Sequence, residues 1–401
     1  MLIPPTRPTA GCIQGWSVMT IQADFKHFIE DFTPFFMSNR KSIYYWKCDR
    51  PSAFRTLNTT GIDENALLDI RESVILLLGK KFGDAVFSLT PGGGQGNHLT
   101  FRAESDRNIY FIRIENGPES DNYMEIEARV LDVVRAAGVP TPIIYAVDSS
   151  RKEAPFSYQF LEHFNDPDLN RWYKTGELSL TGIARNIGQS IAKWQSVRPP
   201  GFGPFDPEAL RGQDVLKGLH ECYPDYFFLN LHKHLAFLVS NEIISENESE
   251  EILAVIDGNR HLLDLKEGCL VHKDLALWNI LGTPYEIKAF IDWDDTISGD
   301  PTDDLSLLAC FHTEEVVNAA IAGYTEIRPL PEDFFPRFWL HLLRNMIVKA
   351  VIRVGGGYFN KRNDFFLIGF EGNGLSLEEI TRQRIYAAME GLSANKEILQ
   401  L

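Results

Sequence analysis

The chain has 401 residues, of which 44% are hydrophobic and 23% charged, which is the balance of a folded globular protein and excludes a disordered one. Its 39 Lys and Arg stand against 55 Asp and Glu, and the net charge of −16 argues against nucleic acid as a partner, because such a field repels phosphate backbones. The five Cys include no CxxC pair, which excludes a disulfide framework or a zinc site and fits a reducing cytoplasm.

Residues 1–62 differ in amino-acid composition from the rest of the chain, because prolines come first and aromatic residues follow. Phe25, Phe28, Phe32 and Phe35 recur at spacings of three and four, which predicts an N-terminal extension that packs on the body of the protein. The early prolines interrupt any signal peptide, and no apolar run approaches the ~20 residues that span a bilayer. We therefore expect a cytoplasmic protein with no membrane partner.

Residues 63–162 predict a small β-rich lobe. A helix opens it over 63–80, and its main helix, over 123–137, is ended by Gly138. Short segments separated by turns predict an antiparallel meander and two further strands, at AVFSLT (85–90), NHLTFRA (97–103), IYFIRIE (109–115), 143–147 and 156–162.

Residues 163–401 have a mostly helical pattern, apart from a β-rich patch between Cys269 and Trp293. A turn is expected at RPPGFGPF (198–205). The whole pattern predicts an α+β fold with two lobes, in which the larger, mostly helical lobe carries the catalytic and substrate-binding residues.

Polar residues with a defined spacing gather between 270 and 305. His272 and Asp274 are followed by Asn279, and Asp292 comes directly after the strand-like sequence KAFI. Phosphoryl transfer from ATP needs a carboxylate that orients an attacking hydroxyl and oxygen ligands that hold Mg²⁺ against the phosphates. These residue types, on one loop and at the end of a neighbouring strand, supply that set.

The order His-x-Asp-(x)4-Asn, Ile-Asp-Trp-Asp and Gly-Asp-Pro-x-x-Asp-Leu resembles the aminoglycoside phosphotransferase and choline kinase family, which has a protein-kinase-like fold. The resemblance implies that His272 and Asp274 are catalytic, that Asn279 and Asp292 bind Mg²⁺, and that Asp304 braces the catalytic loop by hydrogen bonds. Lys273 stands where the family usually has Gly. We interpret it as a bystander that faces solvent, with a phosphate contact as the alternative.

A glycine-rich turn between the first two strands of the meander predicts a nucleotide clamp, because glycines let backbone N–H groups approach phosphates. A simple hairpin turn is the alternative. The family resemblance extends to this loop and assigns nucleotide contacts to Gly93, Gly94, Gln95, Gly96 and Asn97. It also places the hinge between the lobes, and the adenine edge, at the backbone of Phe160, Leu161 and Glu162.

The strand 109–115 and the helix after it are expected to supply an ion pair that grips the nucleotide phosphates. By resemblance Arg113 is the phosphate cation, and Glu127, which shares a helical face with Val130 and Leu131, is its partner. The alternatives are an Arg that faces solvent, a Glu at the edge of the apolar face, and Glu125 as the partner.

These residues favour an ATP- and Mg²⁺-dependent phosphotransferase whose partner is a small molecule with an acceptor hydroxyl. Asp294 and Asp295 follow the metal-binding Asp and favour an amine-bearing acceptor, unless both face solvent. A catalytically inactive nucleotide-binding or scaffolding protein is the alternative. A protein kinase is disfavoured, because the Asp-Phe-Gly and Ala-Pro-Glu sequences are missing. The sequence leaves the oligomeric state open.

Overall fold

The structure is a computed structural model that describes residues 39–54, 64–83, 86–93, 98–115, 117, 119–361, 375–394 and 396. The chain divides into two compact units, residues 1–36 and 37–401. The first unit, with the predicted aromatic extension around Phe25–Phe35, lies outside the described residues. None of the described helices is both long and apolar enough to cross a membrane.

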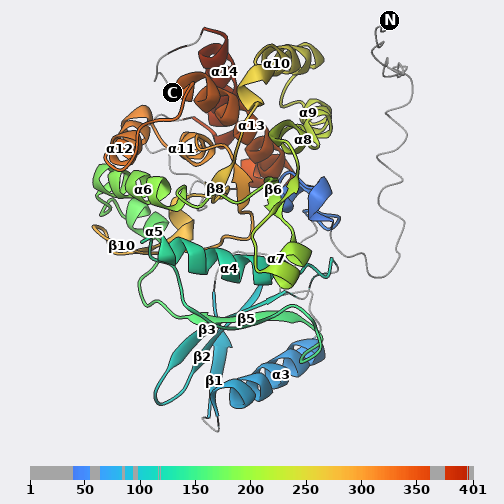
Figure 1. Cartoon of the computed structure of the whole chain (residues 1–401), viewed down its shortest axis with the longest axis vertical. Helices are drawn as coiled ribbons and strands as arrows, with labels where there is room; N and C mark the ends of the chain where they lie inside the picture. The colour runs from blue at the N-terminus through green and yellow to red at the C-terminus, as the bar shows by residue number, and fades with distance from the viewer. Residues whose placement is uncertain are drawn as a thin grey trace, which may run out of the picture. The chain divides into compact units, whose positions relative to one another are not determined.

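The N-terminal lobe is a five-stranded antiparallel sheet with helices on both faces (Figure 1). Its strands follow the order β1-β2-β3-β5-β4, with the bounds β1 (Ser88–Pro91), β2 (Leu99–Glu104), β3 (Ile109–Glu115), β4 (Ile144–Asp148) and β5 (Ser157–Glu162). The apolar residues of α3 (Glu64–Phe82) pack on one face, against Ile112 and Phe160. The main helix α4 (Tyr123–Ala136) covers the other face, toward the helical lobe.

Alternation along β3 decides which side chains reach the space between the lobes. Ile112 and Ile114 belong to the core under α3, so Arg113 points to the opposite face, toward α4. The same rule places Phe160 in the core under α3, whereas Leu161 joins the core that β5 shares with α4.

The second lobe is mostly helical and contains the larger hydrophobic core. Its helices are α5 (Leu169–Lys174), α6 (Leu180–Trp194), α7 (Pro207–Gln213), α8 (Tyr223–Phe227), α9 (Leu231–Ser240), α10 (Glu246–Gly258), η3 (Arg260–Leu263), η4 (Leu277–Asn279), α11 (Asp303–Leu308), α12 (Glu314–Thr325), α13 (Phe334–Gly355), η5 (Tyr358–Asn360) and α14 (Leu377–Ser393). Helices α10 and α14 each begin with a capping box, Ser245 with Glu248 and Ser376 with Glu379. The α+β fold predicted from the sequence, with a small β-rich lobe and a larger, mostly helical one, is confirmed.

Two small sheets carry the polar motif of the second lobe. One has the order β7-β6-β11-β8 and consists of β7 (Gly218–His220), β6 (Phe202–Phe205), β11 (Ile297–Gly299) and β8 (Cys269–Val271). The other is a hairpin of β9 (Ile280–Gly282) and β10 (Ile287–Phe290). His272 follows β8 directly, and Asp292 follows β10 two residues on, so the short strands fix where both side chains begin.

The segment RPPGFGPF differs from its predicted turn, because Phe202–Phe205 form β6 and pair with β11 and β7. Gly203 adopts φ 75°, and a Cβ there would lie 2.9 Å from the His220 ring. Glycine is therefore required for the backbone to pass between β7 and α8, and the buried edge of β11 supplies the pairing that the sequence pattern did not reveal.

Residues 39–54, which comprise η1 (Arg40–Ser42) and α2 (Trp46–Asp49), pack on the helical lobe beside α13. The Tyr44 ring stacks on that of Tyr226 at 4.9 Å between centroids, and the Arg344 guanidinium lies 3.6 Å from the Tyr44 centroid. This short segment thus belongs to the wall of the second lobe, although the β-rich lobe follows it in the chain.

Candidate active site

A cavity of ≈ 710 Å³ lies where the β-rich sheet, α4 and the catalytic loop face one another. Of the residues singled out from the sequence, those that line it are Gly93, Arg113, Glu127, Leu161, Glu162, Asp274, Asn279, Asp292, Asp294 and Asp295. Gly94, Gln95, Gly96 and Asn97 lie outside the described residues. Phe160, His272 and Asp304 are buried behind the cavity wall and do not line it.

The stem of the glycine-rich hairpin closes one side of the cavity. Gly92 N donates to Thr100 O at 2.9 Å, and the Thr100 hydroxyl donates to Gly93 O at 2.8 Å. Gly93 has φ 74°, a backbone conformation that a side chain would strain. These contacts fix Gly93 at the end of the described stem, where it lines the cavity.

Arg113 is held between the sheet and the second lobe. Its Nη1 donates to both carboxylate oxygens of Glu127 at 2.6 Å, and its Nη2 lies 3.2 Å from Asp292 Oδ1. Glu127 is 1% exposed and also accepts hydrogen bonds from Gln159 Nε2 and Trp293 N. The pair is therefore a buried and satisfied one, which offers a fixed cation to the cavity.

Glu125, the competing partner, points elsewhere and contacts Arg211 Nε at 2.7 Å. His98, at the start of β2, was not identified from the sequence. Its Nδ1 lies 2.9 Å from Arg113 Nη2, and burial together with the Arg113 charge lowers the pKa of His98 to about 3. His98 is thus a neutral acceptor that helps to orient the guanidinium. No sequence pattern marks such a residue.

Asp274 and Asn279 are brought together by the single turn of η4. Asn279 Nδ2 donates to Asp274 O at 2.8 Å and lies 3.2 Å from Asp274 Oδ2. Both contacts use the NH₂ side of the amide, so the amide oxygen is the atom that can ligate a cation. Burial favours the neutral acid, but the charges of Lys349 and Lys47 outweigh it and lower the pKa of Asp274.

His272 is fully buried and lies beneath the catalytic loop. Its Nε2 is 3.1 Å from Ile291 O, its Nδ1 accepts from Asp274 N at 3.3 Å, and its ring lies 4.3 Å from that of Trp293. Burial lowers the pKa of His272 to about 4. Its contacts are those of a neutral ring that fixes the backbone of Asp274 rather than those of a group that meets a substrate.

Asp304 supports the same loop from α11. Its carboxylate accepts hydrogen bonds from His272 N at 3.0 Å, Lys273 N at 3.1 Å and Trp194 Nε1 at 3.0 Å. Three donors from two elements converge on one carboxylate, which is the bracing geometry that the family resemblance implies.

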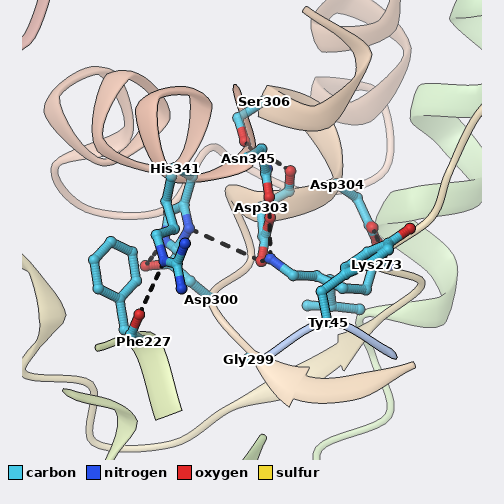
Figure 2. Close-up of polar contacts among 12 residues, drawn as sticks. Tyr45, Phe227, Lys273, Gly299, Asp300, Asp303, Asp304, Ser306, His341 and Asn345 are labelled. Atoms are coloured by element: carbon cyan, nitrogen blue, oxygen red, sulfur yellow. Dashed lines mark hydrogen bonds and ion pairs between the residues drawn. The ribbon is translucent and has the colours of Figure 1, made fainter. Parts of the chain in front are cut away.

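Lys273 differs from its interpretation as a residue that faces solvent, because it is only 1% exposed. Figure 2 shows its side chain directed at Asp303, whose Oδ2 lies 2.6 Å from Lys273 Nζ. The same ammonium donates to Asn345 and to the Tyr44 hydroxyl. The lysine is thus a buried cross-link between the catalytic loop, α11, α13 and the 39–54 segment, not a phosphate contact.

Three carboxylates, of Asp292, Asp294 and Asp295, converge after β10. Burial and the neighbouring Asp294 raise the pKa of Asp292 well above its usual range, and burial with Asp294 raises the pKa of Asp295 to about 7. Asp294 is buried, and Asp295 Oδ1 accepts a hydrogen bond from Trp46 N at 3.1 Å. A cluster of hard oxygen donors at the wall of a cavity fits a divalent cation such as Mg²⁺.

The model of the phosphotransferase enzyme family matches residues 89–332, which is more than half of the chain. The chain belongs to this family. No curated protein sequence matches it significantly.

Solved structures of other proteins show the same fold as this family member. A thermostable mutant of aminoglycoside phosphotransferase APH(4)-Ia, in a ternary complex with AMP-PNP and hygromycin B, is similar with a TM-score of 0.56 at 18% identity, covering 80% of this chain and 98% of its own. A putative fructosamine-3-kinase from Thermobifida fusca is similar with a TM-score of 0.55 at 18% identity, covering 78% and 99%. A putative aminoglycoside phosphotransferase from Ralstonia eutropha gives 0.53 at 18% identity, covering 82% and 99%.

Two further residues that the motif search missed contact Asp274. Lys349 Nζ, from α13, donates to Asp274 Oδ1 at 2.8 Å, and it lies 3.0 Å from the Tyr45 hydroxyl. Burial and the nearby Asp274 charge raise the pKa of Tyr45 well above its usual range. Both residues lie outside the span that matches the family model, so no family signature could have found them.

The end of β5, where the sequence analysis expected the hinge, is more tightly paired than the sequence indicated. Glu162 N donates to Ile143 O at 2.8 Å, and the Glu162 carboxylate accepts from Ile143 N at 3.2 Å. Strand β5 is paired on both sides, with β3 and β4. His163 and Phe164, which follow the strand, line the cavity together with Leu161 and Glu162.

Proposed function

We propose that the protein is an ATP- and Mg²⁺-dependent kinase that transfers the γ-phosphate to a hydroxyl of a small molecule. One observation carries the proposal: the Arg113–Glu127 pair, the Asp274–Asn279 loop and Asp292 all face one cavity. Membership of the phosphotransferase family and the AMP-PNP complex of a structural relative support it.

In this proposal Asp274 orients the acceptor hydroxyl and takes its proton while the oxygen attacks the γ-phosphorus. A new P–O bond forms to the acceptor, the bond between the γ-phosphorus and the bridging oxygen breaks, and its electron pair leaves with ADP. Lys349 holds the Asp274 carboxylate in place, and Arg113 binds the phosphates from the opposite wall. His272 and Asp304 act through the backbone of the loop, as positioning residues.

The donor set fits a magnesium site made by the Asn279 amide oxygen and the Asp292 carboxylate, with Asp294 close to Asp292. Bound Mg²⁺ would neutralise phosphate charge. The crowding that raises the pKa of Asp292 would be relieved by a cation, because the cation offsets the repulsion from Asp294. Asp292 also contacts Arg113, so this carboxylate links the proposed metal site to the arginine that would bind the phosphates.

We further infer that the lobes divide the work, with residues 63–162 binding the nucleotide and 163–401 binding the acceptor. Because Glu162 N is bonded within the sheet, the adenine edge is better served by the backbone at His163 and Phe164 than by Phe160–Glu162. The cytoplasmic location expected from the sequence fits a substrate such as ATP.

The experiment is a coupled assay of ADP release over amino alcohols, amino sugars, sugars and hydroxy acids, with Mg²⁺ and with EDTA. We expect acceptor-dependent and Mg²⁺-dependent ADP release that Asp274→Asn abolishes. A chain that binds MgATP in calorimetry but releases no ADP with any acceptor would instead support the nucleotide-binding scaffold, and failure to bind MgATP would reject both.

A further inference from the structure

A second, small cavity adjoins the large one on the far side of Asp274. It lies among Tyr45, Phe311, Lys349, Ile352, Arg353 and Tyr358. Lys47, Asp274 and Trp278 line both cavities, so the two spaces meet at the carboxylate that we assign to the acceptor hydroxyl. A group of the acceptor next to its reacting hydroxyl would therefore enter the small cavity.

The small cavity has a basic lining. Among the lining residues that the structure describes, the three cations Lys47, Lys349 and Arg353 face one carboxylate, Asp274. Asp294 and Asp295 line the large cavity only. Lys349 is paired with Asp274, whereas Lys47 forms no ion pair with any residue that the structure describes. One carboxylate cannot offset three cations, so the lining keeps a positive excess.

Among these cations Arg353 has the strongest need for a counterion, because its side chain is almost fully buried, with only 2% of the residue exposed. Its Nη1 donates to Thr381 Oγ1 at 2.7 Å and its Nη2 to Cys310 O at 3.4 Å, both neutral acceptors. Within the described part of the chain it forms no ion pair with a carboxylate. The guanidinium has five N–H donors, so donors remain for a ligand.

Burial, together with the nearby charge of Arg384, lowers the pKa of Arg353 to about 10, so the side chain stays charged at neutral pH. A buried charge without a counterion destabilises the folded state. An anion that enters the cavity would remove this penalty, and this favours an acidic ligand over a neutral or cationic one.

The size of the cavity limits which kinds of anion can bind in it. It measures ≈ 30 Å³, and a single water needs roughly 10–15 Å³, so there is room for two water-sized groups. Two oxygens on one carbon match this space, whereas the four oxygens of a phosphate do not. The aromatic rings of Tyr45, Trp278 and Phe311 would cover the carbon atoms that join the anion to the hydroxyl.

We propose that the small cavity binds a carboxylate of the acceptor, so that the acceptor is a hydroxy acid. This proposal rests on the proposed kinase function. Arg353 and Lys47 bind the carboxylate, and the hydroxyl lies at Asp274. The proposed class of acceptor thus differs from a plain sugar or amino alcohol by one acidic group. The acceptor can carry an amine in addition.

Binding is tested with glycolate and glycolamide as matched probes, by saturation-transfer NMR on the full chain with ADP and Mg²⁺. We expect glycolate to bind at least about 10-fold more tightly than glycolamide, because a charge-assisted hydrogen bond is replaced by a neutral one. Lys47→Gln should remove most of this preference. Lys47 is partly exposed on a short segment, so the variant should fold. Lys41→Gln, an exposed lysine on the same segment outside both cavities, is the matched control.

Kinetics give the second readout, with hydroxy acids of two to five carbons and their amides as acceptors. We expect kcat/KM to favour the acids, and Lys47→Gln to lower it for the acids alone by about 10-fold or more. Equal binding of glycolate and glycolamide, or an equal effect of Lys47→Gln on acids and amides, would overturn the proposal. The kinase function fails separately, through loss of MgATP binding in calorimetry, whichever probe binds.

Discussion

The ammonium of Lys349 lies 2.8 Å from Oδ1 of Asp274, although the two residues are 75 positions apart in the chain. Lys349 comes from the long helix α13, whose neighbours include the Tyr45 ring, with its centroid 4.6 Å from the ammonium. The carboxylate that we propose as the catalytic base is thus oriented by a helix and by a segment that both lie outside the span matched by the family model. The first prediction concerns this contact.

Lys349→Met should lower kcat by about 10- to 100-fold, because Asp274 loses the partner that fixes its orientation and small misplacements of catalytic groups are costly. MgATP affinity should stay within about twofold, since Lys349 does not line the nucleotide cavity. Lys349→Arg should recover part of the rate. Steady-state kinetics and calorimetry measure the two effects. Lys288→Met, on β10 outside both cavities, is the control, and a uniform loss of ATP binding in Lys349→Met would contradict a positioning role.

Asp274→Asn should reduce kcat by about two to four orders of magnitude, because the amide cannot accept the proton of the hydroxyl. The carboxamide keeps the shape of the side chain and can still contact Asn279, so the loop should keep its conformation. Calorimetry should give nearly unchanged MgATP affinity. If a folded variant lost nucleotide binding to the same degree as turnover, Asp274 would not be the base.

Asp292→Ala should abolish the Mg²⁺ dependence of ATP binding along with turnover, since it removes a metal ligand and a contact to Arg113. Titrations of ATP into the variant with Mg²⁺ and with EDTA should coincide, whereas those of the wild type should differ. Glu267→Ala, whose exposed side chain contacts Arg198, provides the control. Unchanged MgATP affinity in Asp292→Ala would remove this residue from the site.

Asp303→Asn should destabilise the protein by about 3–5 kcal/mol, because it leaves the buried Lys273 ammonium without its counterion. Burial favours the neutral acid, but Lys273 and His341 outweigh it and lower the pKa of Asp303 below its usual value. A depressed folded-state pKa gives stability that is complete above the unfolded pKa of ~3.9 and is lost as the pH falls through the lower folded pKa.

Urea unfolding from pH 7 to pH 3 checks this prediction. The gap in the free energy of unfolding between wild type and Asp303→Asn should be constant at neutral pH and should begin to shrink only below about pH 4. A gap that closed already near pH 6 would mean that another group titrates. Lys273→Met combined with Asp303→Asn should recover stability, since no unpaired charge remains.

Asp295→Asn should reduce kcat/KM selectively for amine-bearing acceptors, by about 1.5–3 kcal/mol in transition-state free energy for one charge-assisted hydrogen bond. Asp295 lines the large cavity and is held by Trp46 N, so its carboxylate can face a bound ammonium there. Initial rates of wild type and Asp295→Asn on matched acceptors with and without the amine test this selectivity. Identical rates on the two acceptors with wild-type protein would exclude an ammonium site at Asp295.

The sequence predicted the elements with strong periodicity and the residues with a fixed local spacing. Both lobes, the helix α4 and the loop from His272 to Asn279 follow from such patterns, because each is decided within some 10–20 residues. Lys273 was misread, because its partners Asp303 and Asn345 come from distant helices and no local pattern shows that a lysine is buried.

Tyr45, Lys349 and Arg353 escaped the sequence analysis for a related reason. Their relevance arises only when α2 and α13 pack beside the catalytic loop, which is a tertiary event without a sequence signature. β6 was missed likewise, because its pairing with β11 joins segments about 95 residues apart, and Gly and Pro in RPPGFGPF resemble a simple turn.

The position of residues 39–54 affects how relatives can be compared and how the chain can be shortened. The residues that we propose to bind phosphate lie within the matched span 89–332, whereas Tyr45, Lys47, Lys349 and Arg353 lie on either side of it. Relatives with identical signatures can therefore differ in the molecule they phosphorylate, and these four positions are the ones to compare when grouping them. A truncated chain that begins at residue 64 would keep the Arg113–Glu127 pair that we propose for nucleotide binding. It would lose Tyr45 and Lys47, which form part of the cavity wall beside Asp274.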